Sequence, residues 1–312
     1  MCTKNFSSFI RMGSVSELGN NSAHSIVEVE SAELFSTSMG CYRESSAEVL
    51  DAFMNAFTPI DSSDSKLSAL PFLDIGCGDG NFTRRHLLPR GQHQCRKLVA
   101  ADNSTAMLEY ARSHHMHEMI DHVLFDIVND DVNKFLNEHG PFARVYSFNM
   151  LHWVKDQAQA MKNIEKMIAP GGECFVTFEH CIPMFEVAIA LAESARWKQY
   201  AQVLLDKVPI TARSTDMGLM RSHLLHIVNE TALKPLACEV LRLPVVNMPD
   251  LKDATDRIVS YNPIYPHLND EDKEELITST ADILAKRAQG IAEGRISNHR
   301  FTYVIHAYKT AL

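Results

Sequence analysis

The chain has 312 residues, of which 46% are hydrophobic and 22% charged, so it can bury a sizeable core and is not a disordered chain. Its formal net charge of -9 repels phosphate backbones and argues against a nucleic-acid partner. Seven scattered cysteines without C-x-x-C spacing favour a reduced compartment over a disulfide framework. No stretch approaches the roughly 20 apolar residues of a membrane span, and the N-terminus lacks a signal-peptide core. We therefore expect a cytoplasmic protein.

The first half of the chain alternates between strand and helix patterns. A leader rich in Ser and Asn is expected over 1–30, and a helical pattern follows from Ser31 to Phe57. Continuous apolar strands separated by helices predict a parallel sheet that is covered on both faces. The strands are expected at 71–75, 97–101, 122–125, 143–148 and 173–178, and the helices between them begin at Asn81, Ser104 and Gln157.

After Pro183 the rhythm of the sequence changes. The pattern predicts one long helix from Met184 to about Val208, and further helices follow it. A strand is expected at 237–246, a helix at 274–293 and a final strand at 301–308. The predicted organisation is a leader over 1–30, an α/β core with an N-terminal helix over 31–182, and a helical cap with the completing strands over 183–312.

A glycine-rich loop follows the first expected strand, in the run Leu73-Asp-Ile-Gly-Cys-Gly-Asp-Gly-Asn81. Glycines allow a sharp turn into the next helix and let a ligand lie against bare peptide groups. A Walker loop is excluded, because no lysine follows Gly80. Asn81 stands where the dinucleotide fingerprint has its third glycine, which disfavours NAD and FAD.

Acidic residues also end the next two strands. Asp102 lies 24 residues after Gly78, where a carboxylate can accept from ribose hydroxyls. Asp126 could accept from an adenine amino group, with Ile127 packing on the ring. Each acid could instead cap a turn or helix. Three acids closing three successive strands favour a ligand, because ligands of open α/β sheets bind beyond the carboxyl ends of the strands.

The loop Asp74–Gly80 and the run Ala101-Asp-Asn-Ser104 resemble the cofactor site of class I S-adenosylmethionine-dependent methyltransferases. The segment from Tyr146 to Phe178, with Leu151-His-Trp153 and Pro170-Gly-Gly, resembles juvenile hormone acid O-methyltransferases, which methylate the carboxylate of terpenoid acids. The resemblance covers roughly residues 32–180. It implies S-adenosyl-L-methionine as cofactor, a small apolar acid as acceptor, and a Rossmann-like, seven-stranded, mostly parallel sheet with a helical cap inserted before the last strands.

The resemblance also implies site residues. The indole N–H of Trp153 would face the acceptor carboxylate, although a large aromatic residue also packs in cores. The family's N-terminal helix carries an Asn and, three residues later, a Gln that helps to hold the carboxylate. Here Met39 and Tyr42 stand at those places, and the Tyr42 hydroxyl could donate instead. The implied cofactor contacts are Asp74, Gly76, Cys77, Gly78, Gly80, Asp102, Asn103, Asp126, Ile127 and Asn149.

Three alternatives stay open. A carboxylate is ionised at neutral pH and needs no base, but His152 could act as a base towards a hydroxyl or amine acceptor. The departure at Tyr42 also fits a non-catalytic protein that binds the cofactor. An NAD-dependent oxidoreductase is the least favoured. We expect the histidines at 114, 115, 117 and 122 to be solvated rather than metal-bound. The oligomeric state stays open, and a homodimer is one of the alternatives.

Overall fold

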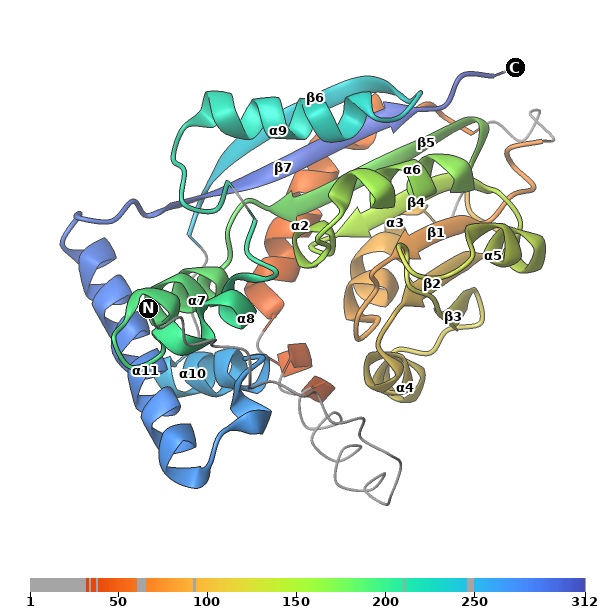
Figure 1. The fold of residues 1–312 in the computed structure, drawn as a ribbon. Helices are drawn as coiled ribbons and strands as arrows, with labels where there is room; N and C mark the ends of the chain where they lie inside the picture. Colours follow the sequence, from red (N-terminus) through yellow and green to blue (C-terminus); the bar gives the residue numbers. More distant parts are fainter. Residues whose placement is uncertain are drawn as a thin grey trace, which may run out of the picture.

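The computed structural model describes residues 32–311 apart from 34, 38, 61–65, 92–93, 210 and 246–249. The leader expected over 1–30 lies outside these residues. Within them, seven strands form one sheet in the order β3-β2-β1-β4-β5-β7-β6 (Figure 1). The strands are β1 (Phe72–Ile75), β2 (Leu98–Asp102), β3 (Ile120–Leu124), β4 (Phe142–Phe148), β5 (Ile168–Glu179), β6 (Lys234–Pro244) and β7 (His299–Tyr308).

The pairing of the strands confirms the expected fold class. Strands β1 to β5 pair in parallel, and β7 runs antiparallel to both β5 and β6. The chain crosses from β3 back to β4 beside β1, so the strand order reverses at β1 and β4. Ligands of open α/β sheets bind at such a reversal, beyond the carboxyl ends of the strands.

Helices cover both faces of the sheet, because successive strand side chains point to opposite sides. Leu73 and Ile75 face one apolar cluster, and Phe72 faces the other. The first cluster is closed by α5 (Val132–His139), α6 (Gln157–Met167) and α9 (Met217–Asn229), and the second by α2 (Gly40–Phe53), α3 (Leu88–Gly91) and α4 (Thr105–His114). Short helices precede α3 and follow α2 and β4, at Thr83–Leu87, Met54–Ala56 and Leu151–Trp153.

Side chains at the helix starts fix several of these boundaries. Ser104 accepts a hydrogen bond from the Met107 N–H at the start of α4, as a good N-cap does. Acidic or amide side chains accept in the same way at five other helices. These N-caps are Asp131 of α5, Asp156 of α6, Asp216 of α9, Asp250 of α10 (Leu251–Ser260) and Asn269 of α11 (Asp270–Ala292).

The cap is built by α10 and α11 together with α7 (Pro183–Glu193), α8 (Ala201–Leu205) and the short helices Lys198–Tyr200 and Tyr265–His267. In Figure 1 it lies beside one end of the sheet. A third apolar cluster, which includes Trp197, holds these helices together. The described part of the chain contains no helix that is long and apolar enough to cross a membrane.

The prediction of one long helix from Met184 to Val208 was wrong. Helix α7 ends at Glu193, and Ser194 adopts extended backbone angles. The Ser194 hydroxyl donates to the Leu191 carbonyl at 2.8 Å and accepts from the Trp197 N–H at 3.3 Å. A serine side chain that bonds nearby backbone groups competes with the helix, and here it stops the helix.

Candidate active site

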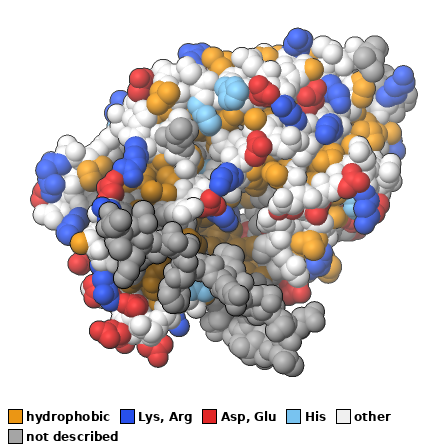
Figure 2. Space-filling view, viewed as in Figure 1, with side chains coloured by type: hydrophobic (Ala, Val, Ile, Leu, Met, Phe, Trp, Pro, Cys, Tyr) orange, Lys and Arg blue, Asp and Glu red, His pale blue; other side chains and the backbone are white. Residues whose placement is uncertain are grey.

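A large cavity lies between the sheet and the cap, at the carboxyl ends of β1, β4 and β5. It encloses about 1050 Å³, including the solvent at its mouth. On the face seen in Figure 2, hydrophobic side chains are visible in a hollow between the cap and the sheet. The glycine loop forms one wall of the cavity. The other walls come from α2 and the segment before it, from the ends of β4 and β5, and from the cap. The lining residues are Phe35, Met39, Tyr42, Arg43, Asp74, Gly76, Cys77, Gly78, Asp79, Phe82, Phe148, Asn149, His152, Trp153, Glu179, Ile182, Pro183, Met184, Arg257, Ile258 and Tyr261.

The three loop glycines have left-handed backbones for different reasons. Their φ angles are +80° at Gly76, +54° at Gly78 and +72° at Gly80. A Cβ at Gly76 would lie 2.3 Å from the Met150 side chain, and one at Gly80 would lie 2.9 Å from the Cβ of Ala111. A Cβ at Gly78 would meet only the Phe35 ring, at 3.5 Å. Two of the glycines therefore permit packing, and Gly78 leaves bare backbone towards the cavity.

The carboxyl groups of two aspartates, Asp74 and Asp102, lie close to this loop. Asp74 is buried, the Thr83 hydroxyl donates to it at 2.6 Å, and burial raises its pKa to about 7. Asp102 accepts from the Gly78 N–H at 2.8 Å and from the Ser104 N–H at 2.9 Å, and burial raises its pKa as well. Like charges in a desolvated loop oppose each other's ionisation, so a cationic ligand would suit this loop better than an anionic one.

The residues expected to hold an adenosine group lie beyond the cavity lining. Asp126 accepts from the N–H groups of Val128 and Asn129 at 2.9 and 3.0 Å, and from the side chain of Asn103 at 3.2 Å. Ile127 is 5% exposed and belongs to the first apolar cluster. Asp126 therefore has a local turn-capping role, and the contacts of Asp102, Asn103, Asp126 and Ile127 with an adenosine group stay predictions.

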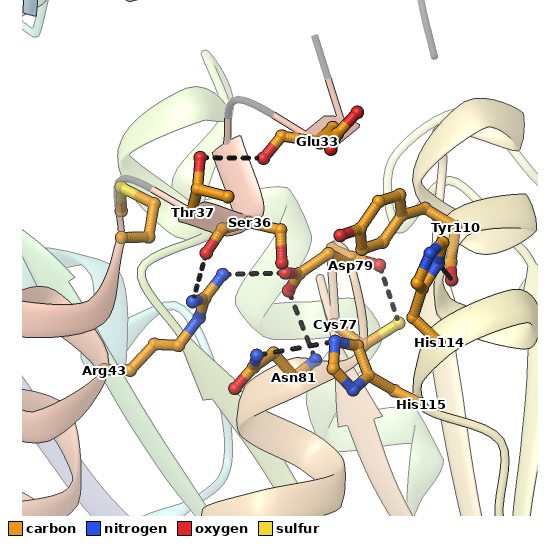
Figure 3. A network of polar contacts seen from close by, with 12 residues as sticks. Glu33, Ser36, Thr37, Arg43, Cys77, Asp79, Asn81, Tyr110, His114 and His115 are labelled. Atoms are coloured by element: carbon orange, nitrogen blue, oxygen red, sulfur yellow. Dashed lines mark hydrogen bonds and ion pairs between the residues drawn. The ribbon is translucent and has the colours of Figure 1, made fainter. Parts of the chain in front are cut away.

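An arginine that no motif singled out ties α2 to the glycine loop. Arg43 forms an ion pair with Asp79 at 2.7 Å and donates to the Ser36 carbonyl at 2.6 Å (Figure 3). Asp79 also accepts from the Asn81 N–H at 3.2 Å, and the Asn81 amide contacts His115 at 3.4 Å. The segment before α2 is thereby held over the loop.

Aromatic side chains after β4 form the wall opposite the loop. Trp153 is 37% exposed, and its ring lies 6.0 Å from Phe185 and 6.1 Å from Tyr261, measured between centroids. The structure thus places Trp153 on the cavity wall and not within an apolar core.

His152 is buried beside Trp153. Its Nδ1 accepts from the Glu179 N–H at 3.3 Å, and burial lowers its pKa to about 3. The ring is therefore neutral at physiological pH, and the proton of a neutral imidazole whose Nδ1 accepts is on Nε2. This makes Nε2 a hydrogen-bond donor instead of a base.

Asn149 and Tyr42 complete the set of expected residues on the wall. Asn149 has a φ of +55°, an uncommon conformation for a residue with a side chain, and its amide donates to the Ser46 hydroxyl at 2.9 Å. Burial raises the pKa of Tyr42, so its hydroxyl stays a donor at neutral pH. Met39 lies on the same wall, one helical turn before Tyr42.

The sequence reasoning missed the contributions of the cap and of the end of β5. Glu179 accepts from Arg300 and, at 2.9 Å, from the Thr302 hydroxyl. Arg257 and Tyr261 come from the C-terminal end of α10. Their spacing of four residues would put them on one face of a helix, and this spacing is the signal that could have linked them.

Comparison with known proteins finds similarity to methyltransferases. Residues 72–172 match a family model described as a methyltransferase domain. The chain is 30% identical over 132 residues to the juvenile hormone acid O-methyltransferase of Bombyx mori. The aligned region covers 42% of this chain and 45% of that protein. It is 34% identical over 136 residues to that of Drosophila melanogaster, with coverages of 42% and 43%. The chain thus spans less than half the length of these relatives. A solved S-adenosylmethionine-dependent methyltransferase from Anabaena variabilis aligns with a TM-score of 0.49 at 12% identity, over 96% of this chain and 100% of that one.

Proposed function

We propose that this chain, which matches a methyltransferase-domain model over residues 72–172, is a class I methyltransferase that transfers a methyl group from S-adenosyl-L-methionine to the carboxylate of a small apolar acid. The observation that carries the proposal is one cavity with an acid-rich glycine loop at one wall and aromatic hydrogen-bond donors at another. The similarity to two juvenile hormone acid O-methyltransferases supports the acceptor class.

The loop fits this cofactor by charge and by shape. A sulfonium and an ammonium group would lie favourably beside the buried carboxyls of Asp74 and Asp102, whereas the pyrophosphate of a dinucleotide would be repelled. Gly78 provides a place where the backbone admits a ligand closely. The two oxygens of Asp102 each accept one backbone N–H, and each keeps a lone pair for a ribose hydroxyl. When bound, the cofactor supplies an activated methyl group.

The residues of the opposite wall would hold and orient the acceptor. The indole N–H of Trp153 and the hydroxyl of Tyr42 are donors that suit carboxylate oxygens. His152 can add the N–H of Nε2, because its Nδ1 already accepts from the backbone. A carboxylate is ionised at neutral pH and carries its own nucleophilic lone pair, so these residues need to position it and not to remove a proton.

The alternatives from the sequence have less support from the geometry. A hydroxyl or amine acceptor would need a base, and His152 has a pKa near 3 with its basic nitrogen engaged. A non-catalytic homologue was suggested by the missing amide at Tyr42, but that position still presents a donor to the cavity.

Methyl transfer from radiolabelled S-adenosyl-L-methionine tests the proposal directly. The acceptors are a panel of fatty and terpenoid acids, with the matching alcohols and amines as controls. We expect label in base-labile methyl esters of at least one acid. Label that appears only in the alcohols or amines would overturn the acceptor class, and cofactor binding without any transfer would support the non-catalytic homologue.

A further inference from the structure

The end of α10 presents two polar side chains to the cavity. Arg257 and Tyr261 are four residues apart, so they lie on one face of the helix end, and both line the cavity with Ile258. The Tyr261 ring lies 6.1 Å from the Trp153 ring, on the wall assigned above to the acceptor. Neither residue belongs to the part of the chain that matches the methyltransferase domain.

The Tyr261 hydroxyl is unsatisfied. Its oxygen is buried and has no hydrogen-bond partner among the residues that the structure describes. Buried polar groups are almost always hydrogen-bonded, so an unpaired hydroxyl on a cavity wall indicates a group that a ligand supplies. Burial raises the pKa of Tyr261 to about 12, and the hydroxyl therefore stays protonated and able to donate.

Arg257 places a buried positive charge on the same wall. Its side chain belongs to a residue that is 8% exposed, and Nη1 lies 3.5 Å from the sulfur of Met39. Two acids of the cavity wall have other arginines as ion-pair partners, since Asp79 contacts Arg43 at 2.7 Å and Glu179 contacts Arg300. Arg257 belongs to neither of these two ion pairs, and its guanidinium adds a positive charge to the cavity wall that attracts an anionic group.

We propose that Arg257 and Tyr261 bind the carboxylate of the acceptor from the cap side, beside Trp153, and thereby select anionic over neutral acceptors. The inference rests on the proposed function for the acceptor class. Arginine offers several N–H donors that match the two oxygens of a carboxylate, and the tyrosine hydroxyl adds another. The apolar remainder of the acid would then lie along the hydrophobic lining.

Binding of a charged and a neutral probe of the same shape tests this selection. Octanoate and octanamide are titrated calorimetrically into the full chain saturated with S-adenosylhomocysteine. We expect Arg257→Gln to weaken octanoate binding by roughly 10- to 100-fold, the usual loss for a charge-assisted hydrogen bond, and Tyr261→Phe by roughly 5- to 10-fold. Both variants should lose less affinity for octanamide, because its neutral amide makes weaker hydrogen bonds with these side chains.

Two controls separate this role from a structural one. Arg295→Gln makes the same change at an exposed arginine and should leave both affinities unchanged. Affinity for S-adenosyl-L-methionine should stay the same in every variant. If Arg257→Gln fails to fold, Arg257→Lys and Tyr261→Phe preserve the volume and should still reduce the preference for octanoate.

The outcomes distinguish the two proposals. Equal loss of octanoate and octanamide, or no loss of either, would overturn the role of Arg257 and Tyr261 and leave the methylation of acids intact. A wild-type protein that binds both probes equally and methylates only neutral acceptors would overturn the acid class and this inference together.

Discussion

Gly76, Gly78 and Gly80 share a left-handed backbone, but only Gly78 both lines the cavity and leaves room for a Cβ. We predict that Gly80→Ala lowers the free energy of unfolding by about 2–5 kcal/mol, because strain at positive φ adds to the clash with Ala111. Gly78→Ala should lower it by only about 1–2 kcal/mol. Urea denaturation measures the free energy of unfolding of both variants. Equal losses would contradict the assignment of Gly80 to close packing and of Gly78 to the approach of a ligand.

The same pair of variants separates stability from binding. Gly78→Ala places a methyl group on the wall where the cofactor is expected, so its affinity for S-adenosyl-L-methionine should fall by more than about tenfold. At a temperature where it is still folded, Gly80→Ala should retain the wild-type affinity, because its added methyl group points towards Ala111 and His122.

Asp74 gives the stability a dependence on pH. Its pKa rises from 3.8 unfolded to about 7 folded, so the folded state binds the extra proton. The associated stability is complete below about pH 4 and is lost as the pH rises to about 7. Between about pH 5.5 and about pH 8 the wild type should lose about 2 kcal/mol relative to Asp74→Asn. Urea unfolding of both proteins at the two pH values measures this, and parallel curves would contradict the protonated carboxyl.

Single residues were predictable where a motif fixes their place. Asp74, Gly76, Cys77 and Gly78 of the loop, and Trp153 after β4, lie on the cavity as their positions in the sequence indicated. Gly80, which was also expected to contact the cofactor, lies outside the cavity lining and faces Ala111. The partner of Asp79 was not predictable, because an arginine on a distant helix shows no pattern that names its contact. The turn-capping role of Asp126 was foreseen only as one of two alternatives.

At the scale of elements, one ion pair joins α2 to the glycine loop. The side chains of Arg43 and Asp79 are 11% and 3% exposed, so removing one leaves a buried charge uncompensated. Arg43→Met should lower the free energy of unfolding by about 3–5 kcal/mol, and adding Asp79→Asn should recover part of that loss. Losses that simply add in a double-mutant cycle would show that the pair does not couple the two elements.

Helix α7 shows where pattern reading fails. The apolar spacing continues past Glu193, and nothing in that spacing shows that Ser194 will bond Leu191 and Trp197 and stop the helix. The five parallel strands were predictable, because each is a short apolar run between turn signals. The cap helices depend on packing around Trp197, which has no local signature.

At the scale of the whole molecule, the cap closes a cavity over the carboxyl ends of the parallel strands, and the histidine of its described lining, His152, is not basic near neutral pH. Asp74, whose pKa is about 7, lies in the glycine loop on the expected cofactor side and not on the wall proposed for the acceptor. We predict that kcat, at saturating cofactor and acid, changes less than about twofold between about pH 6.5 and about pH 8.5. His152 does not titrate there, since its pKa is about 3, and a carboxylate stays ionised. A rate that rises about tenfold per pH unit would indicate an acceptor that must lose a proton.

The acid-rich loop and its glycines are expected to bind a cationic adenosyl ligand. Isothermal titration of S-adenosyl-L-methionine and of NAD⁺ into the same preparation tests this expectation, with Asp102→Asn as the matched variant. We predict saturable one-to-one binding of S-adenosyl-L-methionine, weaker binding by Asp102→Asn, and no binding of NAD⁺ at the same concentrations. Binding of NAD⁺ with no heat from S-adenosyl-L-methionine would contradict the account.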